Sequence, residues 1–206
     1  MVNKTDFGLS DSGLVLIEFQ EEWLNEQGKL HHLLLDKEQF INSLENAKKI
    51  IAAARNAEIS IIHSGLSFSK GHKELGKAKQ GLRAGIVRRE TFLATAQGSC
   101  FSEPFKPQSD ELVVSGRIGS SAFAGSNLDS LLRNNQIHTL YLMGYALHVC
   151  VESTLRAAHD LGYETILIED ACASFTAEQK RYVLNEVVHH FGKSITTQDF
   201  LNLINV

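Results

Sequence analysis

The sequence predicts a three-layer α/β fold, in which a doubly wound and mainly parallel sheet is covered by helices on both faces. Short apolar runs rich in branched side chains recur along the chain, as expected of strands that are buried on both faces. Segments with helical spacing lie between these runs, and parallel neighbouring strands need such crossover connections. The length of 206 residues, with 43% hydrophobic residues and two prolines, favours one domain spanning residues 1–206.

Five apolar runs are predicted as strands and four segments as helices. The strands, in chain order, are residues 13–19, 58–64, 110–116, 137–144 and 163–170. The helices are residues 37–57, 126–135, 151–162 and 176–192. In the first helix, apolar residues from Phe40 to Ala54 form one stripe. In the last helix, Thr176 and Gln179 resemble a capping box.

Residues 65–109 fit this alternation least well. Their periodicity is weak, and a connection of this length is often a lid or an oligomer contact. We expect substrate specificity to reside in this segment, and its pattern does not identify the substrate.

The charge and cysteine patterns argue against several classes of function. The net charge of −4 combines both signs along the chain, so no nucleic-acid partner is expected. No apolar run approaches membrane-spanning length, and the N-terminus lacks the apolar core of a signal peptide. We therefore predict a cytoplasmic protein without a membrane partner. The three cysteines are sparse and odd in number, which predicts reduced thiols and no disulfide framework.

Cys150 lies where the apolar run 137–144 gives way to the predicted helix 151–162. Ligands of doubly wound sheets bind outside the carboxyl ends of the strands. The unpaired N–H groups of a first helical turn also favour a thiolate. Cys150 is therefore a candidate nucleophile, and a buried apolar filler is the alternative. Cys172 is interpreted as a small packed residue, and Cys100 falls in the long connection.

Glu18 and Arg117 also follow predicted strands. An unpaired carboxylate at the end of an apolar strand is costly if it is buried. Either a cation or hydrogen-bond donors meet Glu18, or it acts as an acid or base, or it lies at an exposed strand end. Arg117 follows the strand 110–116, and its cation is placed to face Glu18 or an anionic intermediate. A surface arginine at a turn is the alternative.

Three segments together resemble a known family. LVLIEFQEEWL, VVSGRIGSSAFAGSNLDSLL and GYALHVCVESTLRAAHDLGYETILIEDACAS are similar, in the same order, to the signature regions of the isochorismatase-like cysteine hydrolases. This superfamily includes isochorismatases, nicotinamidases and N-carbamoylsarcosine amidases. The resemblance implies a six-stranded sheet of order 3-2-1-4-5-6 and an Asp, Lys and Cys triad. Glu18 and Arg117 stand in place of the usual Asp and Lys, and Cys150 is unchanged.

The resemblance also implies a mechanism. Glu18 would take the thiol proton, Cys150 would attack an amide-like carbonyl, and Arg117 would stabilise negative charge. A cis peptide bond between Tyr145 and Ala146 is expected, with the amides of Ala146 and Cys150 as the oxyanion hole. The arginine fork can bind a carboxylate at two points. Candidates for the substrate-binding wall are Phe19, Gln20, Tyr145, Leu147 and His148.

The predicted function is cleavage of a C–N bond in a small molecule through a thioester. Two alternatives stay open: a noncatalytic member that binds a metabolite or serves in assembly, and vinyl-ether cleavage of the isochorismatase type. Metal-using nicotinamidases carry an Asp-x-His-x-x-His cluster after the second strand, whereas here SGLSF follows His63. We therefore expect no metal and no other cofactor. The family also implies a homo-oligomer.

Overall fold

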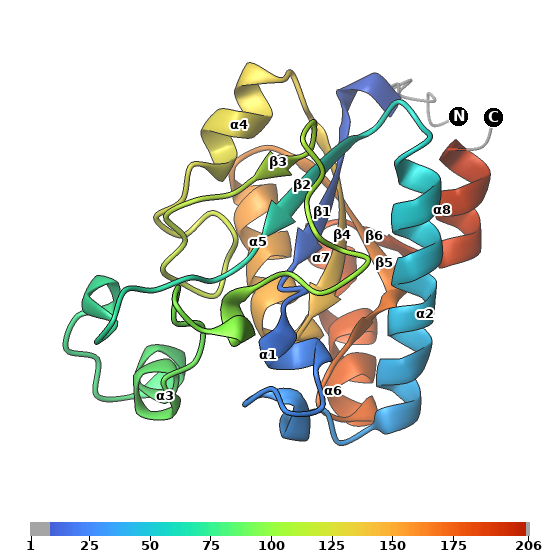
Figure 1. The fold of residues 1–206 in the computed structure, drawn as a ribbon. Helices are drawn as coiled ribbons and strands as arrows, with labels where there is room; N and C mark the ends of the chain where they lie inside the picture. Colours follow the sequence, from blue (N-terminus) through green and yellow to red (C-terminus); the bar gives the residue numbers. More distant parts are fainter. Residues whose placement is uncertain (1–8, 205–206) are drawn as a thin grey trace.

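Six parallel strands form the sheet in a computed structural model that describes residues 9–204. Their order is β3-β2-β1-β4-β5-β6 (Figure 1). The strands are β1 (Ser12–Ile17), β2 (Ser60–Ser64), β3 (Leu112–Val113), β4 (Thr139–Tyr145), β5 (Glu164–Ala173) and β6 (Lys193–Ile195). The predicted three-layer, doubly wound fold and its strand order are confirmed.

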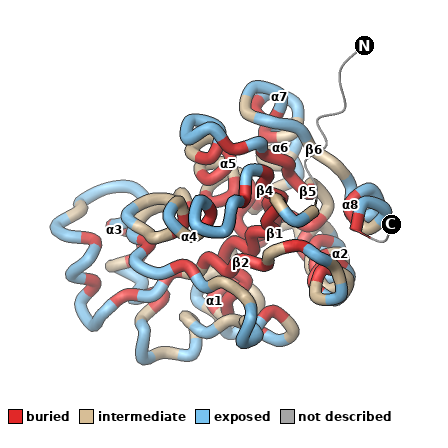
Figure 2. The backbone as a smooth tube through the Cα atoms, turned by 90° about the horizontal axis from the view of Figure 1, so that it is seen from above, coloured by how far each residue is buried: buried red, intermediate tan, exposed pale blue. Residues whose placement is uncertain are grey.

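Helices cover both faces of the sheet. Figure 2 shows α2 and α8 on one side of the strands, and α5, α6 and α7 on the other. The helices are α1 (Glu21–Leu24), α2 (Lys37–Ala54), α3 (Gly81–Arg89), α4 (Leu128–Asn134), α5 (Glu152–Asp160), α6 (Ala177–Tyr182), α7 (Val188–Phe191) and α8 (Thr197–Ile204). Short 3₁₀ turns are η1 (Leu9–Asp11), η2 (His31–Leu33), η3 (Lys73–Leu75) and η4 (Gln97–Ser99), and π-helical turns are η5 (Leu147–Val151) and η6 (Val183–Val187).

The core is centred on β1, whose six residues are all buried. β1 pairs with β2 on one side and with β4 on the other. Burial on both faces explains why its sequence is an unbroken apolar run. The strand order reverses between β1 and β4, and this switch point is where ligands of such sheets bind.

The two central strands approach very closely at their carboxyl ends. Ile17 is in register with Gly144, which has a φ of +135°. A Cβ on Gly144 would collide with the Ile17 carbonyl oxygen. Glycine is therefore required where β4 leaves the sheet toward Cys150.

The structure contains elements that the sequence pattern did not indicate. Strand β6 has three residues and α1 has four, which is too short for periodicity to register. β3 pairs over two residues, where a strand over 110–116 was predicted, because it lies at the sheet edge and bonds only to β2. The capping box of Thr176 and Gln179 is confirmed.

The segment 65–109, predicted as a long connection, contains η3, α3 and η4. Figure 1 shows the part around α3 extending away from the sheet, beyond the carboxyl ends of the strands. We call residues 66–99 the arm. Within the described residues, none of the helices has the length and apolar character needed to cross a membrane. The segment 1–8, used in the prediction about a signal peptide, lies outside the described residues.

Candidate active site

Three strand ends bring Glu18, Arg117 and Cys150 together. Glu18 directly follows β1, Arg117 follows β3, and Cys150 lies in η5 after β4. Arg117 Nη2 is 2.7 Å from Glu18 Oε1, and each of these side chains is only 1% exposed. Of the alternatives that the sequence left open for Glu18, the structure selects a buried carboxylate that a cation meets.

Both oxygens of the Glu18 carboxylate have donors. Trp23 in α1 donates its indole N–H to Glu18 Oε2 at 2.9 Å, and Arg117 reaches Oε1. The Glu18 backbone has a φ of +58°, in the left-handed region that costs a residue other than glycine about 1 kcal/mol. Its N–H donates to the Ser64 carbonyl at 2.9 Å, which holds this turn against the end of β2.

The Arg117 guanidinium is shared between Glu18 and backbone carbonyls. Nη2 bonds both Glu18 and the Ser120 carbonyl. Nε donates to the Gly119 carbonyl at 3.1 Å, and Nη1 lies 3.4 Å from the Ser64 carbonyl. The fork therefore makes one bond to the carboxylate, where two were considered possible. Its other donors fix the turn that follows β3.

The Cys150 thiol is buried against this ion pair. Burial raises the pKa of Cys150 well above its ordinary value, the negative charge of Glu18 raises it further, and Arg117 offsets only part of the increase. This direction is opposite to the one expected from the N–H groups of a first helical turn. The raised pKa favours the protonated thiol, which would need a base in order to act as a nucleophile.

The backbone before Cys150 has the expected form. The peptide bond between Tyr145 and Ala146 is cis. The Ala146 N–H has no hydrogen-bond acceptor among residues 9–204, and Ala146 lines the pocket described next. The Cys150 N–H donates to the Ala146 carbonyl at 3.0 Å. Of the two predicted oxyanion donors, Ala146 is available, and Cys150 would have to share its N–H.

A pocket of about 340 Å³ has Glu18, Ala146 and Cys150 in its wall. Most of the remaining wall is aromatic and aliphatic. It is formed by Trp23, Leu30, Leu33, Leu66, Leu82, Ile86, Phe92, Val149 and Phe175, with Gly81, Gly85, Arg88, Arg89 and Thr91 completing it. Much of this wall comes from the arm, which lies within the segment 65–109 where specificity was expected to reside.

The five side chains predicted to form the wall do not line this pocket. Phe19, Tyr145 and Leu147 are completely buried in the core, where Phe19 packs on Tyr145 with ring centroids 5.2 Å apart. His148 packs edge-on against Phe175, which itself lines the pocket. Successive side chains at a strand end point in different directions, so Phe19, which follows Glu18, turns into the core.

Gln20, the fifth predicted wall residue, holds the arm instead. Its Oε1 accepts from the Leu66 N–H at 2.8 Å. Its Nε2 donates to the Leu66 carbonyl at 2.8 Å and to the Ser99 carbonyl at 2.6 Å. Gln20 thus ties together the two ends of the arm, so its amide is not free to meet a ligand.

The sequence interpretation missed Trp23 and the pocket-lining residues of α3. Trp23 had a usable signal, because it is the single tryptophan of the chain and lies five residues after Glu18. The α3 segment, Gly81–Arg89, had little signal, since its apolar residues are few and two of its nine positions are glycine.

Replacing Trp23 by phenylalanine is expected to lower kcat about tenfold, because Glu18 Oε2 loses the donor that orients it. KM should change less than kcat, since phenylalanine keeps an aromatic wall in the pocket. Steady-state kinetics on any substrate identified for the protein will measure both constants. An unchanged kcat would show that this hydrogen bond does not position the carboxylate.

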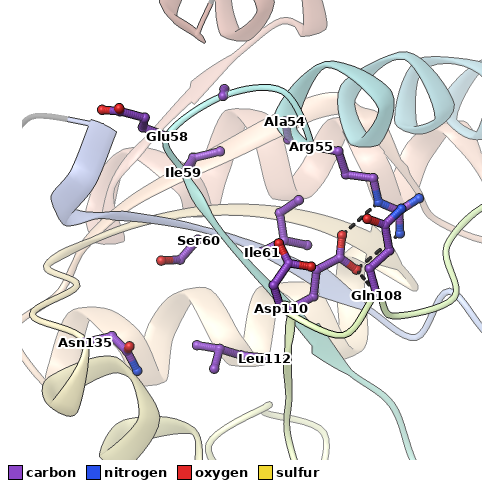
Figure 3. A pocket seen from close by; sticks show the side chains of 12 residues that line it. Ala54, Arg55, Glu58, Ile59, Ser60, Ile61, Gln108, Asp110, Leu112 and Asn135 are labelled. Atoms are coloured by element: carbon purple, nitrogen blue, oxygen red, sulfur yellow. Dashed lines mark hydrogen bonds and ion pairs between the residues drawn. The ribbon is translucent and has the colours of Figure 1, made fainter.

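A second pocket, of about 330 Å³, lies at the other end of the strands from the first pocket, near the amino ends of β2 and β3 (Figure 3). Arg55 and Glu111 in its wall are paired with each other. Arg55 Nε is 2.7 Å from Glu111 Oε1, and Glu111 Oε2 is 2.7 Å from His63 Nε2. Burial alone would raise the pKa of Glu111, but hydrogen bonds from Arg55, the Gln108 N–H and His63 outweigh it and lower the pKa to about 2. We interpret this network as structural.

Replacing Glu111 by glutamine is expected to lower the free energy of unfolding by about 3 kcal/mol at pH 7, because Arg55 and His63 lose their charged acceptor. The pKa of Glu111 is lowered in the folded state, so its stabilisation is present above the ordinary value of 4.5 and is lost as the pH falls toward about 2. Urea unfolding at pH 7, 4 and 3 measures this. The variant should lose less stability than the wild type across this range, and an equal loss in both would contradict the assignment.

Among the described residues, no group of three or more His, Cys, Asp or Glu side chains is placed to hold a metal ion.

Comparisons with known proteins are informative about the family. Residues 12–199 match the Isochorismatase domain. The chain is 32% identical, over 207 residues, to the ureidoacrylate amidohydrolase RutB of Variovorax paradoxus, with 93% of this chain and 81% of that protein covered.

Solved structures share the fold at lower identity. A cysteine hydrolase from Pseudomonas syringae pv. phaseolicola superposes with a TM-score of 0.82 at 20% identity, covering 96% of this chain and 94% of that one. N-carbamoylsarcosine amidase from Thermoplasma acidophilum gives a TM-score of 0.70 at 20% identity, covering 91% and 96%. The domain match extends over nearly all of the described chain, and the protein therefore belongs to the isochorismatase family.

Proposed function

We propose that the protein is a cysteine-dependent hydrolase that cleaves an amide-like C–N bond of a small molecule through a thioester. The observation that carries this proposal is the Cys150 thiol, which is buried against the Glu18 and Arg117 ion pair in the wall of an apolar pocket. The relatives add support, because RutB is an amidohydrolase and the enzyme from Thermoplasma acidophilum is an amidase. A cytoplasmic location and a homo-oligomer stay predictions from the sequence.

In the first half of the proposed reaction, Glu18 accepts the proton of Cys150 as the sulfur attacks the carbonyl carbon. The C–S bond forms, and the carbonyl oxygen becomes an oxyanion. The Ala146 N–H is free to donate to this oxygen, with the Cys150 N–H as a shared second donor. Because burial raises the pKa of the Cys150 thiol, we expect its proton to move to Glu18 as the sulfur attacks, and not before.

In the second half, protonated Glu18 gives its proton to the leaving nitrogen as the C–N bond breaks. Water then attacks the thioester while the Glu18 carboxylate accepts a proton from it. The acid product leaves, and the thiol takes back its proton. Arg117 stays charged throughout, because a guanidinium does not give up its proton at working pH. It stabilises the carboxylate and the developing thiolate.

The proposed function is tested by a screen of amides, ureides and related small compounds with the purified protein. At least one compound should be turned over by the wild type and by Cys172→Ala, but not by Cys150→Ala. Cys172 is a matched control because it is also fully buried and does not line the pocket. Amide turnover that survives in Cys150→Ala would exclude the thioester route, turnover of vinyl ethers alone in a parallel screen would favour isochorismatase-type cleavage, and no turnover of any compound would favour a noncatalytic member.

A further inference from the structure

Two arginines lie at the active-site pocket without a partner. Arg88 and Arg89, in the last turn of α3, both line it. Neither guanidinium forms an ion pair or a hydrogen bond with another residue in the range 9–204. Among the described residues, other exposed cations such as Arg83 also lack a carboxylate partner, so the feature that distinguishes Arg88 and Arg89 is their place in the pocket wall. The pocket therefore has two positive charges that no group of the protein neutralises.

The Arg89 side chain lies along α3, over a glycine of the pocket wall. Its Nη1 lies 3.6 Å from the position that a Cβ on Gly85 would occupy. Gly85 lines the pocket, so the guanidinium folds back along α3 over a position that has no side chain. A Cβ at position 85 would be in ordinary van der Waals contact with this guanidinium.

Apart from Glu18 and Cys150, the rest of the wall is mainly apolar, with one buried hydroxyl that lacks a partner. The rings of Trp23, Phe92 and Phe175 contribute to it. Thr91 also lines the pocket, and its Oγ1 is buried with no hydrogen-bond partner among the described residues. An unpaired buried hydroxyl costs free energy, and a polar group of a ligand can satisfy it. Apart from Glu18, the arginines are thus the charged groups of the wall, and Thr91 adds a buried hydroxyl without a partner among the described residues.

We propose that the substrate is an amide with an apolar body and an anionic group, such as a carboxylate, and that Arg88 and Arg89 bind this group. The inference rests on the proposed function and names the substrate class of the same site. With its anion at the two arginines, the substrate places its carbonyl toward Cys150, while the aromatic rings contact the body between them. The anion thereby fixes which end of the molecule reaches the thiol.

Binding to the Cys150→Ala protein tests this inference without requiring turnover. The probes are aryl and alkyl amides, each prepared as the carboxylate and as its uncharged methyl ester, with affinities measured by calorimetry. The best-bound carboxylate is expected to bind about tenfold more tightly than its ester. The ratio should fall toward one when Arg88→Gln and Arg89→Gln are added, and it should decrease at high salt.

Arg83→Gln is the matched control, because Arg83 is exposed on the same helix and does not line the pocket. It should leave the ratio unchanged. A ratio near one in the parent protein, or one that survives loss of both arginines, overturns the inference. If the wild type hydrolysed the esters and the carboxylates equally well, the inference would be overturned and the proposed function would stand. Carboxylates that bind through the arginines but are never hydrolysed would support it and count against the proposed function.

Discussion

Replacing Cys150 by alanine is expected to lower kcat for amide hydrolysis about ten thousandfold or more. The thiol is the only group in the proposed mechanism that forms a covalent bond to the substrate. It lies in the wall of the pocket, beside Glu18, the proposed acceptor of its proton. Alanine keeps the apolar packing of this position, so the variant should fold as the wild type does. Steady-state turnover and circular dichroism measure the two effects.

The control for this variant is Cys172→Ala. Cys172 belongs to β5 and, like Cys150, is buried with a raised pKa, in its case about 12 because of burial. Its replacement should leave kcat within a few-fold of the wild type. If Cys150→Ala kept most of its activity, the carboxylate alone would be sufficient for the chemistry, and the thioester route would be wrong.

Replacing Glu18 by glutamine has the second largest expected effect, because this carboxylate acts both in the chemistry and in the ion pair. Loss of the base should lower kcat about a thousandfold. Arg117 is left buried without its anion, so the free energy of unfolding should fall by about 3 kcal/mol. Kinetics and urea unfolding separate these effects. A stable variant with full activity would contradict both roles of Glu18.

The family resemblance supplies a sharper comparison, because its usual residues at these positions are Asp and Lys. Glu18→Asp alone withdraws the carboxylate from Arg117, and Arg117→Lys alone removes donors from the carbonyls of Gly119 and Ser120. If Glu18 and Arg117 act as one unit, the double variant should retain more activity than the product of the two single losses predicts. Losses that multiply would show that each residue acts independently.

Much of the fold could be predicted from the sequence because its strands are buried on both faces. β1 and β4 appear as unbroken apolar runs for this reason. Strand β6 and helix α8 gave no such pattern. β6 is three residues long, and α8 has only eight. β6 is too short for a period to register, whereas α8 is amphipathic, with Thr197, Phe200 and Ile204 buried on one face, and was missed because it covers only about two turns.

For the candidate site, sequence reasoning identified the residues at strand ends and missed those that the arm supplies. Glu18, Arg117 and Cys150 follow strands, and parallel strands end at one edge, so the three could be placed together. The wall residues Phe92 and Arg89 come from a segment with weak periodicity, and the two ends of this segment are tied together by Gln20. Such long-range hydrogen bonds have no signature in a single sequence.

The central claim is that Cys150 carries the acyl group during turnover. Acid quenching of the wild-type protein while it hydrolyses an amide, followed by peptide mass spectrometry, tests it directly. The predicted result is an adduct with the mass of the acyl group on the peptide that contains Cys150, removed by hydroxylamine and absent from Cys150→Ala. Continued turnover with no adduct on this peptide, under conditions in which a thioester survives the quench, would contradict the account.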